Sequence, residues 1–200
     1  VRALLAAGGI SLFISLFATP AFMRLFKKLQ WGQFIRDDGP QTHHTKRGTP
    51  TMGGLVILAA AIVGYFVAKL VNGETPSASA LLVLFMMTGL GLVGFVDDLM
   101  KVRNQRSLGL SGWAKIGGQA AVAIAFAVLA LQFPNDRGLT PASTNISLFR
   151  DLPLDLFFWG SIVGMGLFVL WVFLLVASSS NGVNIADGLD GLASGSAIFA

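Results

Sequence analysis

The sequence contains no cysteine and carries little charge. The absence of cysteine excludes disulfide frameworks and thiolate metal sites. Charged residues make up 12% of the chain and hydrophobic residues 54%, and the mean hydropathy is +0.72. Ordinary soluble domains are roughly 25% charged. This composition excludes a typical water-soluble fold and predicts a protein embedded in a lipid bilayer.

Uncharged apolar runs recur along the chain at lengths that suit membrane spans. A helix crosses about 30 Å of hydrocarbon with roughly 20 residues. We expect five spans, at residues 3–23, 52–68, 78–96, 116–133 and 156–177, and a further apolar stretch opens at Leu189. The expected fold class is therefore all-α, a polytopic transmembrane helical bundle with five spans and the start of a sixth.

No internal repeat or hydrophilic linker divides the chain, so residues 1–200 are expected to form a single membrane-embedded domain. The sequence begins at Val1 rather than Met and stops at Ala200 inside an apolar segment, which indicates part of a longer protein. Turn-forming residues such as Pro134 and Gly138 gather between the fourth and fifth spans. They favour a short hairpin within residues 134–155.

Basic residues concentrate in alternate loops. The loops after the first and third predicted spans hold Arg24, Lys27, Lys28, Arg36, Lys46 and Arg47, and Lys101, Arg103, Arg106 and Lys115. The other loops hold only Lys69, Arg137 and Arg150. Because loops rich in lysine and arginine stay in the cytoplasm, this asymmetry predicts an N-terminus outside. Membrane topology thus explains the net charge of +4, and no nucleic-acid partner is expected.

Two adjacent carboxylates, Asp97 and Asp98, stand at the inner end of the third span. Ionisable groups at a membrane boundary are costly to desolvate, so they are functional candidates by default. Helical spacing puts Lys101 on the face of Asp97, whereas Asp98 lies about 100 degrees around the helix. A divalent ion is a second neutralising candidate, because Mg²⁺ sites often combine one or two carboxylates with substrate phosphates. The structural alternative is a hydrated interfacial pair with Lys101 as a topological anchor.

Polar residues recur at every third position where the fifth span ends. They are Asn181, Asn184, Asp187 and Asp190. On a regular helix each step of three falls about 60 degrees short of a full turn, so these side chains would not share one pocket wall. Gly182, Gly188 and Gly191 favour a break in the helix that lines a polar pocket. The alternative is a hydrated turn between the fifth and sixth spans.

Two lysines complete the candidates on the predicted inner face. Lys46 and its neighbour Arg47 precede the second span, where they can bind a substrate phosphate or anionic lipid headgroups. Lys115 opens the fourth span, where it either neutralises nearby charge or snorkels beside Trp113. Since the acidic, amide and lysine groups all fall on one predicted membrane face, the sequence indicates a cytoplasm-facing site.

Three segments carry a resemblance to a known family. They are Lys46-Arg-Gly-Thr-Pro-Thr-Met-Gly-Gly54, Gly94-Phe-Val-Asp-Asp98 and the run over 184–193, which contains Asp187-Gly-Leu-Asp-Gly. In this order and at these separations, the chain resembles the phospho-N-acetylmuramoyl-pentapeptide-transferase family over essentially its whole length. These are polyprenyl-phosphate sugar-1-phosphate transferases of the bacterial inner membrane. The resemblance implies that the chain carries the N-terminal half of a multi-pass transferase domain.

The resemblance also implies a reaction. UDP-MurNAc-pentapeptide would donate phospho-MurNAc-pentapeptide to undecaprenyl phosphate, with Mg²⁺ required and UMP released. The product would be the first lipid intermediate of peptidoglycan synthesis, which serves cell wall biogenesis, cell shape and cell division.

Residue roles follow from the same resemblance. Catalytic roles are implied for Asp97, Asp98, Lys101 and Lys115, with both carboxylates near Mg²⁺ and both lysines facing phosphates. Substrate-binding roles are implied for Lys46, Asn181, Asn184, Asp187 and Asp190. The family's third metal-binding acidic residue and its His-rich inner loop are expected downstream of Ala200.

Two other functions are left open. A sister enzyme that transfers GlcNAc-1-phosphate from UDP-GlcNAc to the same lipid would keep the Asp pair, although the Thr-Pro-Thr-Met-Gly-Gly run favours the muramoyl-pentapeptide enzyme. A cation-coupled transporter would use Asp97, Asp98 and a broken fifth helix as its ion site, and it predicts inverted repeats, which we do not find in the sequence. The oligomeric state is also open, a homodimer included.

Overall fold

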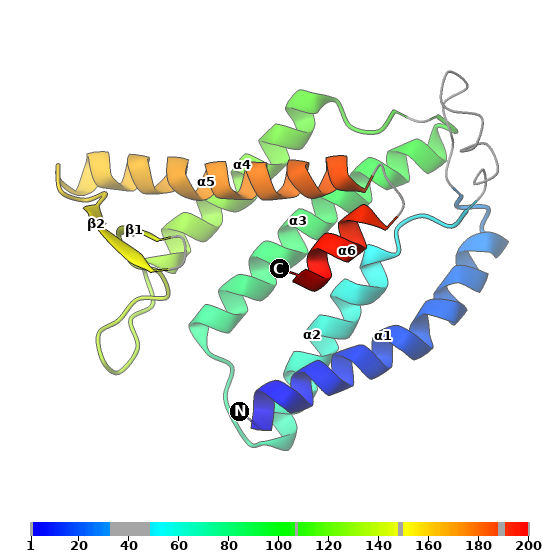
Figure 1. The fold of residues 1–200 in the computed structure, drawn as a ribbon, viewed down its shortest axis with the longest axis horizontal. Coiled ribbons are helices and arrows are strands. Elements are labelled where there is room, and N and C mark those ends of the chain that lie inside the picture. Colours follow the sequence, from blue (N-terminus) through cyan, green and yellow to red (C-terminus); the bar gives the residue numbers. More distant parts are fainter. Residues whose placement is uncertain (1, 33–48, 107, 148–149, 188–190, 200) are drawn as a thin grey trace. The chain divides into compact units, whose positions relative to one another are not determined.

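The computed structural model describes residues 2–32, 49–106, 108–147, 150–187 and 191–199. In that part of the chain it contains six helices and one two-stranded sheet (Figure 1). The elements are α1 (Arg2–Lys28), α2 (Gly54–Val71), α3 (Ala78–Arg103), α4 (Gly112–Ala130), β1 (Asn145–Ser147), β2 (Asp151–Asp155), α5 (Ser161–Ala186) and α6 (Leu192–Phe199). The chain divides into two compact units, Val1–Lys115 and Ile116–Ala200, so the boundary falls within α4.

Five of the helices in the described ranges, α1 to α5, are long and apolar enough to cross a membrane. This confirms the predicted all-α, multi-pass membrane protein, and a short sixth helix, α6, follows α5. The helices extend beyond the predicted spans at their basic ends. α1 continues past Met23 to Lys28, and α3 continues through the Asp pair to Arg103. Lysine and arginine propagate a helix well and complement the negative end of its dipole, so the helix outlasts the apolar run.

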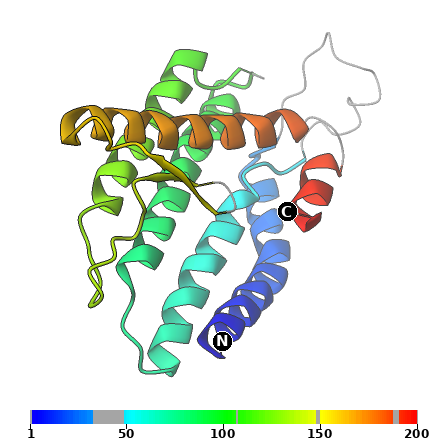
Figure 2. The ribbon, with the colours of Figure 1, turned by 60° about the vertical axis from the view of Figure 1, so that its left-hand side comes forward.

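In the first unit, α1 and α2 lie side by side (Figures 1 and 2). Gly64 permits this approach, because a Cβ at its position would collide with Ser11 Oγ and lie 2.9 Å from the carbonyl oxygen of Ala7. Gly91 of α3 serves a similar purpose, since its Cβ would lie 3.1 Å from Leu58 Cδ2 of α2. Glycine at such contacts lets membrane helices approach closely.

A hydrophobic cluster joins three helix ends in this unit. Phe26 near the end of α1, Met52 just before α2 and Val102 near the end of α3 are buried in it. Around them pack Phe22, Trp31, Leu55, Phe95 and Leu99. Met52 has φ +65°, a conformation that non-glycine residues hold only where their surroundings impose it. The loop after α1 and the loop after α3 therefore start at the same end of the unit, as their shared basic character predicted.

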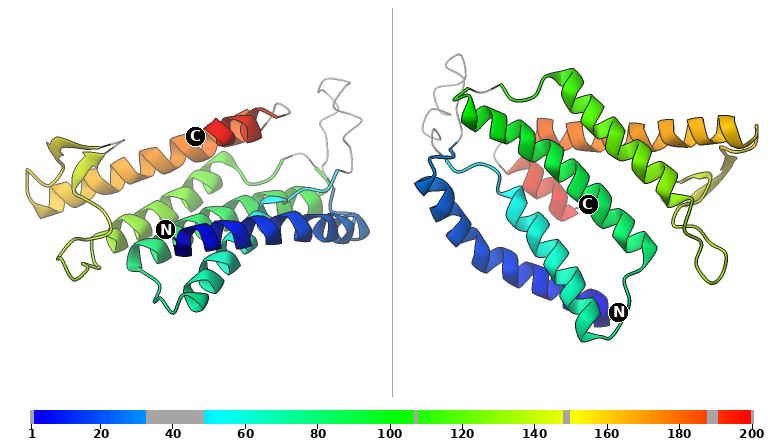
Figure 3. Two further views of the ribbon diagram at one scale, coloured as in Figure 1. Left: turned by 60° about the horizontal axis from the view of Figure 1, so that its bottom comes forward. Right: turned by 180° about the vertical axis from the view of Figure 1, so that it is seen from behind.

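In the second unit, a β-hairpin lies between α4 and α5 (Figure 3). β1 and β2 are antiparallel, with Asn145 opposite Asp155 and Ser147 opposite Asp151. The short hairpin predicted within residues 134–155 is thus confirmed. Because the chain leaves the hairpin through a turn at Gly160, with φ +98°, α5 begins at Ser161 and not at the predicted residue 156.

α5 is one continuous helix from Ser161 to Ala186. Gly182 does not interrupt it, because a single glycine costs a helix only about 1 kcal/mol, which the rest of a long helix readily offsets. The break that Gly182, Gly188 and Gly191 predicted comes after Ala186, where α5 ends, and before Leu192, where α6 begins. The chain turns later, at Gly191 with φ +78°, before α6. Gly188 and Asp190 lie outside the described residues.

Candidate functional site

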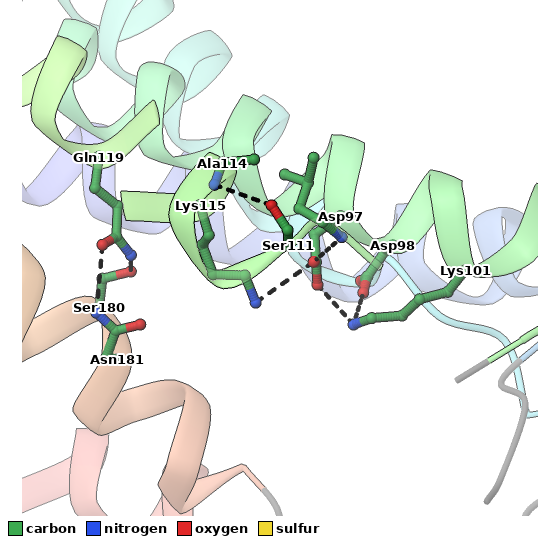
Figure 4. A network of polar contacts seen from close by, with 10 residues as sticks. Asp97, Asp98, Lys101, Ser111, Ala114, Lys115, Gln119, Ser180 and Asn181 are labelled. Atoms are coloured by element: carbon green, nitrogen blue, oxygen red, sulfur yellow. Dashed lines mark hydrogen bonds and ion pairs between the residues drawn. The ribbon is translucent and has the colours of Figure 1, made fainter. Parts of the chain in front are cut away.

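Within α3, Lys101 joins the two adjacent carboxylates (Figure 4). Its Nζ lies 2.7 Å from Asp97 Oδ2 and 2.9 Å from Asp98 Oδ1. The first contact is the predicted pairing of residues four apart. The second was not expected, because the helical angle alone placed Asp98 on a different face. Residues three apart are also neighbours on a helix, and the flexible stem of lysine reaches both carboxylates.

Asp97 is the buried member of the pair, at 5% exposure. Its Oδ1 accepts a hydrogen bond of 2.8 Å from the backbone N–H of Leu110 and lies 3.4 Å from Lys115 Nζ. Ser111 helps to place Lys115, because its hydroxyl caps α4 by accepting a hydrogen bond from the N–H of Ala114 at 3.2 Å. A buried carboxylate is tolerated as an anion only when charges and donors compensate it. Two lysines and one amide do so here.

Asp98 is more open, with its side chain 30% exposed. Its Oδ2 accepts a hydrogen bond of 3.2 Å from Thr51 Oγ1, which belongs to the segment just before α2. That segment is attached to the end of α1, because Pro50 pairs with Gly32 and the N–H of Thr51 donates to the carbonyl of Trp31 at 3.4 Å. The Thr-Pro-Thr-Met-Gly-Gly run and the Asp pair are thus in direct contact.

The structure therefore brings together Asp97, Asp98, Lys101 and Lys115, the residues predicted to be catalytic. Lys46 lies outside the described residues. Sequence reasoning missed Thr51 and the Leu110 amide as members of the cluster. Thr51 belongs to the Lys46–Gly54 segment that the sequence already indicated as functional. The backbone N–H of Leu110 could not be predicted, because every residue except proline has one.

A separate polar cluster lies within the second unit (Figure 4). Gln119 of α4 is 2% exposed, and its Nε2 donates to Ser180 Oγ of α5 at 3.0 Å. Asn181 Nδ2 donates to Gln119 Oε1 at 3.3 Å and to the carbonyl of Ala177 at 2.8 Å. Both amide hydrogens of Asn181 are thus used within the protein. These contacts give Asn181 a role in joining α4 to α5, while its substrate-binding role stays a prediction.

The remaining predicted substrate-binding residues lie near the end of α5. Asn184 is exposed on the last turns of the helix, and Asp187 is its exposed C-terminal cap. Because α5 stays helical here, Asn181 and Asn184 are about 60 degrees apart around the helix, and the half-buried Asn181 faces α4 while Asn184 is exposed. Asp190 is outside the described residues.

The donor chemistry of the Asp pair fits part of a Mg²⁺ site. Carboxylate oxygens are the hard ligands that Mg²⁺ prefers, and the ion commonly takes one or two of them together with waters and substrate phosphates. Among the described residues, no group of three or more His, Asp or Glu side chains is arranged to hold a metal. The described residues would therefore contribute Asp97 and Asp98 to such a site.

Known proteins match the chain over these same segments. Residues 46–58 match signature 1 of phospho-N-acetylmuramoyl-pentapeptide-transferase. The phospho-N-acetylmuramoyl-pentapeptide-transferase of Clavibacter michiganensis subsp. michiganensis is 62% identical over 203 residues, which cover 98% of this chain and 55% of that protein. Those of Kineococcus radiotolerans and Streptomyces griseus subsp. griseus are 57% and 52% identical, over 98% and 100% of this chain and 54% of each relative. The chain spans about half the length of these relatives.

The resemblance seen in the sequence is thereby confirmed. The widest family match covers residues 80–200, which include the Asp pair, both lysines of the cluster and the polar end of α5. On this evidence the chain belongs to glycosyl transferase family 4.

Proposed function

We propose that the protein carrying this chain transfers phospho-MurNAc-pentapeptide from UDP-MurNAc-pentapeptide to undecaprenyl phosphate, releasing UMP and forming the first lipid intermediate of peptidoglycan synthesis. One observation carries the proposal: Asp97, Asp98, Lys101 and Lys115 form a compact cluster at one end of membrane-spanning helices. Relatives more than half identical to this chain bear the name of that transferase.

The cluster suits a reaction between two anions. When one phosphate attacks another, the barrier is dominated by charge repulsion, and catalysis consists largely of positioning and electrostatic stabilisation. Lys101 and Lys115 supply two positive charges held in place by Asp97. We assign to these lysines the neutralisation of substrate phosphates. When bound by Asp97 and Asp98, Mg²⁺ would screen the two phosphates and stabilise the charge on the departing UMP.

The two carboxylates are suited to different tasks. Asp97 is surrounded by donors, so it anchors the lysines and stays anionic. Asp98 is more exposed, and its side chain leaves more room for an incoming ligand. Loss of either should stop the reaction, because the lysines and the pair depend on each other.

The proposal includes an orientation. The basic residues at this end of the first unit favour the cytoplasmic side of the bacterial inner membrane. The N-terminus would then lie outside the cell, and the Asp pair would lie at the cytoplasmic face. A cytoplasmic site gives access to soluble UDP-sugars, while the lipid acceptor diffuses within the bilayer.

The test uses the complete protein in nanodiscs with Mg²⁺, UDP-MurNAc-pentapeptide and undecaprenyl phosphate, with release of UMP and formation of lipid product both measured. Asp97→Asn and Asp98→Asn should each abolish turnover. Asp151→Asn, in the exposed strand β2, is the matched control and should leave turnover unchanged. Full turnover in the Asp97→Asn variant would remove the Asp pair from the mechanism.

The same preparation separates the competing functions. Turnover with UDP-GlcNAc in place of the muramoyl substrate would assign the protein to the sister transferases. Cation-driven solute uptake into proteoliposomes, without UMP release, would favour a transporter. The match of residues 46–58 to the muramoyl-pentapeptide signature is the observation that favours the muramoyl-pentapeptide transferase over these two alternatives.

A further inference from the structure

The loop between α3 and α4 folds back onto the helix that precedes it. α3 ends in a Schellman turn, in which the N–H of Gln105 donates to the carbonyl of Val102 at 3.3 Å and the N–H of Arg106 to that of Lys101 at 3.1 Å. Gln105 takes the left-handed conformation that this turn requires, with φ +49°. Beyond this turn, Gly109 and Leu110 lie against Asp97 of α3.

The returning loop touches Asp97 at Gly109, where there is no space for a side chain. A Cβ on Gly109 would collide with Asp97 Oδ1 and would lie 2.6 Å from its carbonyl oxygen and 2.8 Å from its Cγ. Since the carbonyl oxygen belongs to the backbone of α3, it cannot move aside. Gly109 does not have a positive φ, so its glycine is required for close approach and not for an unusual backbone conformation.

The close approach delivers the next backbone amide to the carboxylate. The N–H of Leu110 donates to Asp97 Oδ1 at 2.8 Å, so this hydrogen bond exists only while Gly109 remains against α3. Lys115 Nζ lies 3.4 Å from the same oxygen, and the same short loop leads into its helix. Within the described residues, the side chain of Asp98 contacts Lys101 and Thr51 and makes no corresponding contact to this loop.

We propose that Gly109 and the backbone N–H of Leu110 form a clamp that positions the Asp97 carboxylate, and with it Lys115, for the transfer reaction. This inference rests on the proposed function. Gly109 and Leu110 are positioning residues, because they act through Asp97. Displacing a reacting or charge-bearing group by about 1 Å can lower the rate about 10²-fold, so loss of this clamp should lower turnover.

Gly109→Ala tests the steric half of the clamp in the complete transferase in nanodiscs. The added methyl group should displace the loop and lower kcat by roughly 10- to 100-fold. KM for UDP-MurNAc-pentapeptide should change by less than about threefold, because the clamp acts on Asp97 and not on substrate affinity. Gly112→Ala is the matched control three residues along, where an added Cβ meets nothing within 4 Å, and it should retain wild-type kcat.

Leu110→Pro tests the hydrogen-bonding half, because proline lacks the N–H that Asp97 accepts. The matched control is Leu110→Ala, which also removes the leucine side chain but keeps the backbone N–H. The clamp predicts that Leu110→Pro turns over at least about tenfold more slowly than Leu110→Ala, in line with the loss of one hydrogen bond to a charged group. Titration of active sites with bound substrate restricts the comparison to folded protein.

The outcomes separate the clamp from the reaction it serves. If the wild-type protein shows no transferase activity, the proposed function fails first. If the wild type is active and Gly109→Ala equals Gly112→Ala in kcat per active site, the clamp is wrong. If Gly109→Ala does not fold, the Leu110 pair decides, and equal turnover of Leu110→Pro and Leu110→Ala overturns the clamp.

Discussion

Thr51 Oγ1 donates a hydrogen bond of 3.2 Å to Asp98 Oδ2, across 47 positions of sequence. This contact links the segment before α2 to the Asp pair of α3. Because Asp98 also contacts Lys101, the Thr51 hydroxyl is one of two side-chain partners that fix the orientation of this carboxylate among the described residues.

Thr51→Val keeps the branched shape of the side chain and removes the donor. We expect turnover to fall roughly tenfold, which corresponds to about 1.4 kcal/mol and to the usual worth of a hydrogen bond to a charged group that is partly solvated. Thr51→Ser keeps the hydroxyl and should recover most of the activity. Equal rates for the valine and serine variants in the UMP-release assay would mean that the hydroxyl does not position Asp98.

Lys101→Met keeps most of the length of the lysine stem but removes its charge. Asp97 would retain Lys115 and the Leu110 amide, whereas two adjacent carboxylates would lose the cation between them. Removing one partner of a buried ion pair is strongly destabilising, but Lys101 is 34% exposed, so we expect a loss of about 1–3 kcal/mol. Thermal unfolding in detergent measures it.

A double-mutant cycle checks that this loss comes from the carboxylates. In the Lys101→Met background, Asp98→Asn should restore part of the stability, because it removes an anion that has lost its partner. Simple additivity of the two changes would contradict the ion-pair explanation. Lys101→Arg should not fully restore activity, since the rigid, planar fork of a guanidinium places its donors differently from a compact ammonium group.

The membrane helices could be predicted because the thickness of the bilayer dictates the length of an uncharged run. The residues at which these helices end could not be predicted in this way, because a helix can continue outside the hydrocarbon through charged residues such as Lys28 and Arg103. The helix break predicted from Gly182, Gly188 and Gly191 comes after Ala186, and Gly182 itself stays inside α5 for a related reason. Local glycine content does not outweigh the hydrogen bonding of a long helix.

The candidate site was predictable where it depends on helix geometry and not where it depends on loop paths. Asp97 and Lys101 are four apart on one helix, so their pairing follows from the sequence. Thr51 and Leu110 reach the Asp pair only because the chain turns back after α1 and α3, and tertiary packing sets those turns. Gln119 was passed over, although a polar side chain within an apolar span is a signal for a helix contact.

Gln119→Leu tests the polar contact between α4 and α5. The change leaves Ser180 without its donor and leaves Asn181 with only the carbonyl of Ala177. Hydrogen bonds between membrane helices are worth roughly 0.6–2 kcal/mol, so we expect a loss of that order in unfolding free energy. Gln132→Leu, at an exposed position just after α4, is the control and should have little effect. An unchanged thermal midpoint for Gln119→Leu would show that the contact does not stabilise the unit.

Gln105→Gly should stabilise the turn that ends α3. Gln105 holds φ +49°, and a left-handed conformation costs a residue with a side chain roughly 1–2 kcal/mol, which glycine avoids. Glycine loses more chain entropy on folding, so the expected net gain is up to about 1 kcal/mol. Gln132→Gly is the control: φ is not positive there, so the glycine brings no relief of strain and should lower the thermal midpoint.

The same turn sends the chain back toward Gly109, so its variants should also affect activity. Gln105→Val should destabilise the protein and slow turnover, whereas Gln105→Gly should preserve turnover. A lower midpoint for Gln105→Gly than for the wild type would mean that the left-handed turn stores no strain.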